Sequence, residues 1–131
     1  MGLARHEINT QRKMQMIDIT KTVEQDITIQ EGVCVIFSPH ATCGIVITSK
    51  ENILCNDLLY GYAKAFPAQD PYYHSSQDAG AHMKSAALGC SQTLIIHEGK
   101  LLLGEDQAIY FTEQDGPNCR SFMVKTLEGS L

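Results

Sequence analysis

Three histidines, His40, His74 and His82, occur in local sequences that suit a metal-binding site. His74 lies in PYYHSSQ, a polar loop by its Pro and Ser content, and His82 lies in AGAHMKSAALG, whose composition favours a helix. His40 follows proline in SPHATCG, at the end of a predicted strand. Neutral imidazoles in loop or helix-entry positions are ligands for a divalent metal such as zinc. Ordinary surface or hydrogen-bonded structural histidines are the alternative, and the pattern leaves both open.

Asp78 precedes His82 by four residues. If Asp78 opens the helix that carries His82, its carboxylate can cap free N–H groups of the first turn. Alternatively, the carboxylate can reach the imidazole of His82, because residues four apart are neighbours on a helix surface.

Other side chains near these histidines allow chemistry but also have plain structural roles. Lys84 and Arg120 can hold a phosphate, or can be solvated or ion-paired surface groups. Cys43 can act as a ligand or nucleophile, although a small buried cysteine is the commoner case and is favoured here. Ser85 and Ser91 lie close to His82 in sequence, but no G-x-S-x-G motif accompanies them, which argues against a serine hydrolase.

The composition is that of an ordinary globular chain. At 131 residues with 44% hydrophobic and 19% charged residues, the sequence predicts one domain over residues 1–131 with a flexible terminus over residues 1–10. The formal net charge of −5 argues against a general nucleic-acid or anionic-membrane surface. A phosphorylated small molecule would therefore need a local cluster of donors or a metal.

Five scattered cysteines form no C-x-x-C pair, which predicts reduced thiols rather than a disulfide framework or a zinc ribbon. The first sixteen residues contain no apolar stretch of the kind found in signal peptides. The absence of a long apolar run argues against a membrane span. We therefore expect a cytoplasmic protein.

The first half of the chain alternates between strand and helix signals. Near-alternation of apolar residues predicts a strand over residues 11–19. Residues 20–30 follow as a helix opened by Thr20, with a strand as the alternative because β-branched residues are frequent there. Continuous apolar runs predict buried strands over residues 33–37 and 44–48, and a helix over residues 51–65 ends before Pro67.

The second half is rich in strands. After the His82 helix, which Gly89 closes, residues 92–97 and 100–103 form a predicted hairpin around Glu98-Gly99. Residues 107–112 and 121–127 form a second predicted hairpin. A strand-rich half with two or three packing helices predicts an α+β domain.

Several separate motifs occur in an order that resembles the YjbQ family. They are PHATCG, SKEN, Asp57, YYH, AHMKSAALG, EGKLLLGEDQ and EQDGPNCR. The resemblance extends from about residue 17 to the last strand. Members of this family are described as uncharacterised conserved proteins or as secondary thiamine-phosphate synthases. The resemblance implies an α+β fold with a mixed or antiparallel sheet, assembled as a homotrimer.

The resemblance also implies a histidine-lined pocket, which holds a metal in some members. Carried over residue by residue, the pocket comprises His40, His74 and His82, with Glu51 and Asp57 as nearby acids. The metal would be zinc, magnesium or manganese. In an enzyme, His40, His82 and Glu51 would be the catalytic residues.

The sequence departs from the family pattern at three places. Asp78 stands where the family has asparagine, and Glu105-Asp106 stand where it has Thr-Trp. Asn118 replaces an arginine, although Arg120 follows two residues later. We expect Lys84, Arg120, Asp78 and Asn118 to surround a bound phosphate. The loss of a guanidinium fork weakens phosphate binding, and the added carboxylate of Asp78 either strengthens metal binding or weakens phosphate binding.

Three functions follow from the resemblance and the histidines. The first is weak thiamine-phosphate synthase activity, in which hydroxymethylpyrimidine diphosphate joins a thiazole phosphate and diphosphate is released. Metal-assisted hydrolysis is the second, with imidazoles holding a zinc ion that activates water. The third is a trimer that binds a metal or a small ligand without turnover.

Overall fold

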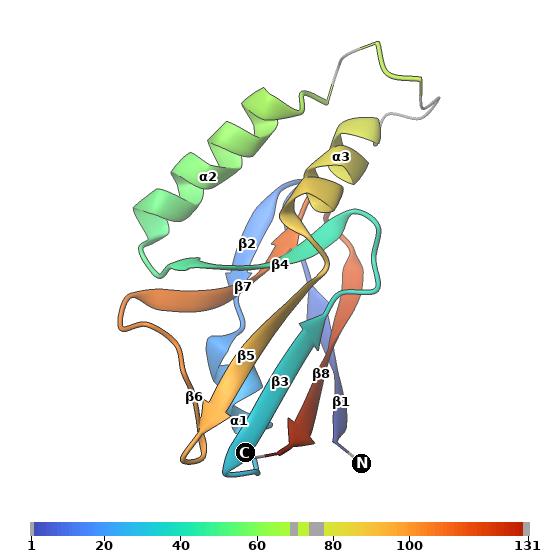
Figure 1. Ribbon diagram of the computed structural model, residues 1–131. Coiled ribbons are helices and arrows are strands. Elements are labelled where there is room, and N and C mark those ends of the chain that lie inside the picture. Colours follow the sequence, from blue (N-terminus) through green and yellow to red (C-terminus); the bar gives the residue numbers. More distant parts are fainter. Residues whose placement is uncertain (1, 69–70, 74–77, 130–131) are drawn as a thin grey trace.

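Two antiparallel β-sheets pack face to face, and three helices accompany them (Figure 1). The computed structural model describes residues 2–68, 71–73 and 78–129. The larger sheet has the strand order β1 (Leu3–Asn9), β8 (Cys119–Glu128), β3 (Glu31–Phe37), β5 (Ser91–His97) and β6 (Lys100–Leu101). The smaller sheet has the order β2 (Gln15–Asp18), β7 (Gln107–Glu113) and β4 (Cys43–Ser49). The helices are α1 (Thr20–Gln25), α2 (Asn52–Ala65) and α3 (Ala79–Leu88). The predicted α+β class is confirmed.

The hydrophobic core lies between the two sheets. Alternate residues of each strand point inward, as the pleat of a β-strand requires. From the larger sheet the buried side chains are Cys34, Ile36, Leu94, Ile96, Phe122 and Val124, and from the smaller sheet Cys43, Ile45, Ile109 and Phe111. The rings of Phe111 and Phe122 meet across the two sheets with centroids 6.1 Å apart.

The two longer helices lie at the end of the molecule opposite the chain termini (Figure 1). Helix α2 covers the outer face of the smaller sheet, where Cys55 packs against Ala108 and Tyr110. Helix α3 lies against β4, and the amide N–H of Ile45 donates to the carbonyl of Gly89 at 3.1 Å. The helices of the described chain are all too short or too polar to cross a membrane.

The amino terminus is an ordered strand. Strand β1 pairs with β8 from Leu3↔Lys125 to Asn9↔Cys119, so the predicted flexibility of residues 1–10 is wrong for residues 3–9. Residues of LARHEIN alternate between half-buried and exposed positions, which suits an edge strand. His6, on the inner side, lies 2.6 Å from the Asp26 carboxylate.

Two predicted elements are shorter than expected. The predicted strand over residues 11–19 is limited to β2, and the predicted helix over residues 20–30 ends with α1. Ile27 and Ile29 pack against the core from the extended segment that follows α1. The β-branched side chains that made strand an alternative there therefore serve packing rather than helix formation.

The predicted hairpin of residues 107–112 and 121–127 is wrong. Strand β7 pairs with β2 and β4, whereas β8 pairs with β1 and β3 in the other sheet. The connection between them crosses from one sheet to the other. Thr10 and Lys13 hold this connection, because the Thr10 N–H donates to the carbonyl of Asn118 and the Lys13 carbonyl accepts from the N–H of Gly116.

Candidate functional site

A pocket of about 480 Å³ lies between α3 and the connection from β3 to β4. Its lining residues are His40, Ala41, Cys43, His82, Ser85, Ala86, Gly89 and Cys90. The two imidazoles come from elements far apart in sequence, and the packing of α3 against β4 brings them to one pocket. Two of the three histidines expected to form a site are therefore brought together, and His74 lies outside the described residues.

The ring of His40 is tied to the start of β8. Its Nε2 accepts the backbone N–H of Ser121 at 3.0 Å. Its own backbone N–H donates to Ser38 Oγ at 3.4 Å. Because Nε2 is an acceptor, a neutral His40 ring carries its proton on Nδ1. The contact with Ser121 thus fixes both the tautomer and the position of the ring.

His40 is expected to reduce stability in mild acid. Burial lowers the pKa of His40 below its ordinary value of 6.5, and the nearby charge of Arg120 acts in the same direction. The unfolded chain therefore binds a proton first, so stability is full above about pH 6.5 and falls as the pH drops towards the folded pKa. His40→Gln should reduce the difference between thermal midpoints measured at pH 5.5 and pH 7.5.

His97 provides the opposite control for that measurement. A hydrogen bond to Glu31 raises the pKa of His97, so its contribution is present below about pH 6.5 and is lost as the pH rises through the folded value. His97→Gln should therefore increase the acid sensitivity, the opposite of the effect of His40→Gln. An unchanged acid sensitivity in His40→Gln would contradict the role assigned to His40.

Asp78 contacts His82 across one helical turn. The Asp78 Oδ2 and His82 Nε2 atoms are 3.1 Å apart. Asp78 stands at the helix N-cap position but makes no side-chain capping hydrogen bond. Of the two roles that the four-residue spacing allows, the contact with the imidazole is the one observed. A carboxylate partner orients a histidine ring.

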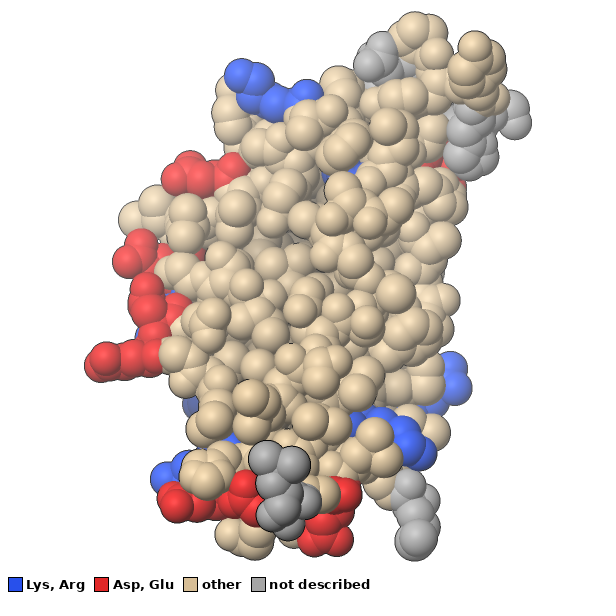
Figure 2. Space-filling view, viewed as in Figure 1, with Lys and Arg blue, Asp and Glu red and all other residues tan. Residues whose placement is uncertain are grey.

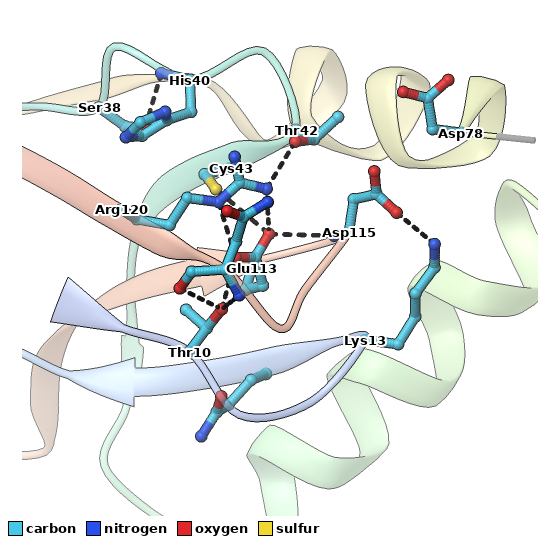
Figure 3. Close-up of polar contacts among 12 residues, drawn as sticks. Thr10, Lys13, Ser38, His40, Thr42, Cys43, Asp78, Glu113, Asp115 and Arg120 are labelled. Carbon is cyan, nitrogen blue, oxygen red and sulfur yellow. Dashed lines mark hydrogen bonds and ion pairs between the residues drawn. The ribbon is translucent and has the colours of Figure 1, made fainter. Parts of the chain in front are cut away.

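A buried ion pair lies beside the His40 connection, which is the segment between β3 and β4 that carries His40 (Figure 3). The Arg120 guanidinium donates from Nε to Glu113 Oε1 at 2.8 Å and from Nη2 to Oε2 at 2.7 Å. Thr10 Oγ1 and the N–H of Asp115 also donate to this carboxylate, at 2.7 and 3.0 Å. Arg120 Nη2 reaches Thr42 Oγ1 at 2.9 Å. Figure 3 shows Arg120 extending from β8 towards Glu113 and Thr42.

Cys43 behaves as a small buried residue, as the sequence favours. Burial raises the pKa of the Cys43 thiol to about 12, and the negative charge of Glu113 contributes. The thiol lies 3.4 Å from Glu113 Oε2 and can donate to it. A protonated thiol is neither a good metal ligand nor a good nucleophile. All five cysteines are free, and Cys90 at the pocket rim is exposed.

The residues expected to bind phosphate have other surroundings in the structure. Arg120 is occupied by Glu113, and Lys84 is only 4% exposed on the inner side of α3. Burial lowers the pKa of the Lys84 amine. The Asn118 side chain accepts the N–H of Cys119 at 3.1 Å in an exposed turn. Asp78 contacts His82, so each of the four has surroundings of its own, and their shared phosphate site stays a prediction.

The acids carried over from the family lie away from the pocket. Glu51 is exposed at the N-cap of α2, beyond the end of β4 opposite to the His40 connection. A seven-residue strand spans roughly 20 Å, so Glu51 does not approach His40 or His82 within this chain. Asp57 is exposed on α2. Among the described residues, no group of three His, Cys, Asp or Glu side chains is arranged to hold a metal.

Two features of the site were not predicted. Ser85 lines the pocket, although its sequence context predicts only the absence of a hydrolase motif. Glu113 is fully buried within the chain, where it pairs with Arg120. The sequence contains one signal for the burial of Glu113. This residue directly follows the largely apolar run QAIYFT, and a buried charge there requires a partner.

Comparisons with known proteins agree with the fold and cover nearly the whole chain. Residues 4–129 match the family model described as UPF0047 protein YjbQ-like. A UPF0047 protein of Methanocaldococcus jannaschii is 36% identical over 129 residues, which cover 95% of this chain and 94% of that protein. The YugU protein of Bacillus subtilis is 36% identical over 126 residues, with 92% and 96% coverage.

Solved structures show the same similarity. An uncharacterised conserved protein of Clostridium acetobutylicum has a TM-score of 0.92 at 38% identity and covers 95% of this chain and 99% of its own. A protein of unknown function from Sulfolobus solfataricus has a TM-score of 0.94 at 31% identity, with 97% and 96% coverage. The chain belongs to the YjbQ-like UPF0047 family.

Proposed function

We propose that the pocket between α3 and the His40 connection binds a small molecule and is the functional site of the chain. The observation that carries this proposal is that His40 and His82, from separate elements, line one pocket of about 480 Å³. Concave sites of this size with a few convergent polar groups are the usual form of small-molecule sites.

His82 is the residue best placed to move a proton. Its 3.1 Å contact with Asp78 orients the ring, as a carboxylate does for many catalytic histidines. His40 differs, because its Nε2 accepts the N–H of Ser121 and burial keeps its pKa low. His40 therefore offers a neutral ring with a proton on Nδ1, which can donate a hydrogen bond to a ligand.

The divalent metal expected on His40, His74 and His82 fits the described residues incompletely. Asp78 supports His82 as a carboxylate supports a metal-bound histidine. His40 does not fit, since coordination by Nε2 displaces Ser121 and coordination by Nδ1 requires a proton on the nitrogen that faces the Ser121 N–H. We therefore assign no step to zinc, magnesium or manganese, and we treat these metals as variables of the assay.

The first reaction to test is weak thiamine-phosphate synthesis, which the family resemblance suggests. In this reaction the thiazole nitrogen would bond to the methylene carbon of the pyrimidine diphosphate while the bond from that carbon to diphosphate breaks and free diphosphate leaves. His82 would orient the pyrimidine or transfer a proton. Asp78 adds negative charge beside His82, and the charge of Arg120 is balanced by Glu113. Both features oppose the entry of an anionic substrate. They also favour the third predicted function, a ligand-binding protein without turnover.

The synthase proposal predicts slow product formation that depends on His82. Purified wild type should convert the pyrimidine diphosphate and thiazole phosphate to thiamine phosphate with magnesium, manganese or zinc, and His82→Ala should abolish the product. Asp78→Asn combined with Asn118→Arg should increase the rate, because the pair removes a negative charge and adds a positive one. His97→Ala, at an exposed hairpin, is the control. If neither the wild type nor the double variant forms more product than His82→Ala, the synthase reaction is ruled out.

We also propose that the outer face of the larger sheet forms a homotrimer, as the family resemblance suggests. Val33 of β3 lies between Ile95 of β5 and Leu127 of β8 in the strand register. Ile95 is 58% and Leu127 54% exposed. Figure 2 shows few charged side chains on the face over β3, β5 and β8. Exposed apolar side chains gathered on one sheet face are typical of a subunit interface.

Light scattering at micromolar concentration should give about three times the 14.5 kDa chain mass. Ile95→Asp should shift the protein towards the monomer, because each interface would then bury a carboxylate. Ile53→Asp is a matched control, since Ile53 is exposed on α2. A monomeric wild type would contradict the trimer, and an Ile95→Asp trimer would exclude this face.

A further inference from the structure

The described lining of the pocket contains no formally charged residue type. It consists of two histidines, two cysteines, one serine and three residues with small or absent side chains. His40 Nε2 accepts the N–H of Ser121, which only an unprotonated nitrogen can do, and the buried Cys43 thiol lies against the Glu113 carboxylate, to which it can donate. None of these described lining residues is a lysine or arginine that would balance the charge of a phosphate inside the pocket.

Arg120 and Lys84 are the cations near the pocket residues, and neither lines the pocket. Arg120 makes a bidentate pair with Glu113 and a further bond to Thr42. Lys84 precedes the pocket residue Ser85 but does not line the pocket itself. Its side chain is buried, and burial lowers the pKa of its amine. Phosphate recognition therefore has little support at this place.

Ser85 supplies the polar group of the pocket that lacks a partner. The residue is 5% exposed, and its Oγ has no hydrogen-bond partner in the part of the chain that the structure describes. A serine inside a helix usually bonds the carbonyl one turn earlier, and Ser85 does not make this bond. A buried hydroxyl is normally satisfied, so this one calls for a partner. Rotation about a single bond can direct it to a ligand.

We infer that the pocket takes an uncharged nitrogen heterocycle, which Ser85 anchors by a hydrogen bond, and that any phosphate on the ligand remains outside. The inference rests on the proposed ligand-binding role of this pocket. A ring with adjacent donor and acceptor groups suits the available partners, because the Ser85 hydroxyl donates and accepts and the neutral His40 ring donates from Nδ1. Ala41, Ala86 and Gly89 add only small or absent side chains to the lining.

The test uses 4-aminopyrimidine as the heterocycle and inorganic diphosphate as the competing anion. Each is titrated at pH 7.5 into ¹⁵N-labelled protein, and amide shifts are recorded. We expect 4-aminopyrimidine to shift the amides of residues 40–43 and 82–90 in wild type. Ser85→Ala should weaken this binding roughly 5- to 10-fold, the usual effect of one hydrogen bond. Ser91→Ala, at an exposed position on β5, should not change it.

Opposite results would overturn the inference. These are no aminopyrimidine shifts in wild type, equal affinity in Ser85→Ala, or diphosphate that displaces the heterocycle from the same amides. Ser85→Cys is the second variant if Ser85→Ala does not fold, since it keeps the size of the side chain and weakens the hydrogen bond. Thiamine phosphate formation is measured separately. A heterocycle that binds without turnover would then support this inference while the synthase reaction fails.

Discussion

Replacing Glu113 with alanine is expected to lower the free energy of unfolding by about 3–5 kcal/mol, the usual cost of breaking a buried ion pair. Glu113 is fully buried and Arg120 largely so. The substitution leaves the guanidinium without its bidentate partner. It also removes the acceptor for Thr10 Oγ1 and for the N–H of Asp115. These contacts link the end of β7 to β8 and to the segment after β1, so their loss loosens the junction of the two sheets.

Chemical denaturation at pH 7 measures this effect, and a double variant provides the control. Glu113→Ala with Arg120→Met removes both charges and should recover part of the lost stability, because no uncompensated guanidinium remains buried. A loss below about 1 kcal/mol in Glu113→Ala would mean that water solvates Arg120 easily, contrary to the packing described here.

The pH dependence of the same ion pair has a definite sign. Burial by itself raises the pKa of Glu113, but hydrogen bonds from Arg120, Thr10 and the Asp115 N–H outweigh it, so the pKa lies below the ordinary 4.5. The contribution of Glu113 to stability is therefore complete above about pH 4.5. It is lost as the pH falls through the folded pKa.

Gly44→Ala is expected to lower the unfolding free energy by about 1–3 kcal/mol, the range for overpacked sites, and to weaken ligand binding. A Cβ atom at Gly44 would lie 2.7 Å from the carbonyl oxygen of Gly89 and 3.1 Å from Thr112 Oγ1. The Gly89 carbonyl is backbone and also accepts the N–H of Ile45, so it cannot turn aside without moving the end of α3. That movement separates His82 from His40.

Gly61→Ala is the matched control for Gly44→Ala. A Cβ atom at Gly61 meets nothing within 4 Å on α2, and alanine is the better helix former. Gly61→Ala should therefore stabilise slightly, by up to about 1 kcal/mol, and leave ligand binding unchanged. Equal binding in the two variants would show that the pocket does not depend on the close packing of α3 against β4.

Most strands and the two longer helices could be predicted from the sequence, because apolar alternation, apolar runs and helix-ending residues are local signals. The pairing partners that place each strand in its sheet could not be predicted in the same way. Strand β8 joins β1 across more than a hundred residues, and no local pattern in the two segments specifies this partner. The turn residues at 114–117 therefore suggested a hairpin that the long-range pairing excludes.

The site was predictable to a similar degree. The four-residue spacing from Asp78 to His82 allowed either a helix cap or a contact between the two side chains, and the structure has the contact. The approach of His40 to His82 depends on how α3 packs on β4, and only the family resemblance pointed to it. Ser85 and the Glu113–Arg120 pair acquire their surroundings from tertiary structure, so their chemistry could not be predicted from neighbouring residues.

The most direct test of the pocket as the functional site is a titration of protein labelled with ¹⁵N at the histidine rings. The pyrimidine diphosphate is added at pH 7.5, and the ring resonances are assigned by single substitutions. Resonances of His40 and His82 should shift together with one dissociation constant, while those of His6, beside Asp26, and His97, in the exposed hairpin, stay unchanged. Shifts confined to His6 or His97, or no shift at His40 and His82, would contradict a ligand site in this pocket.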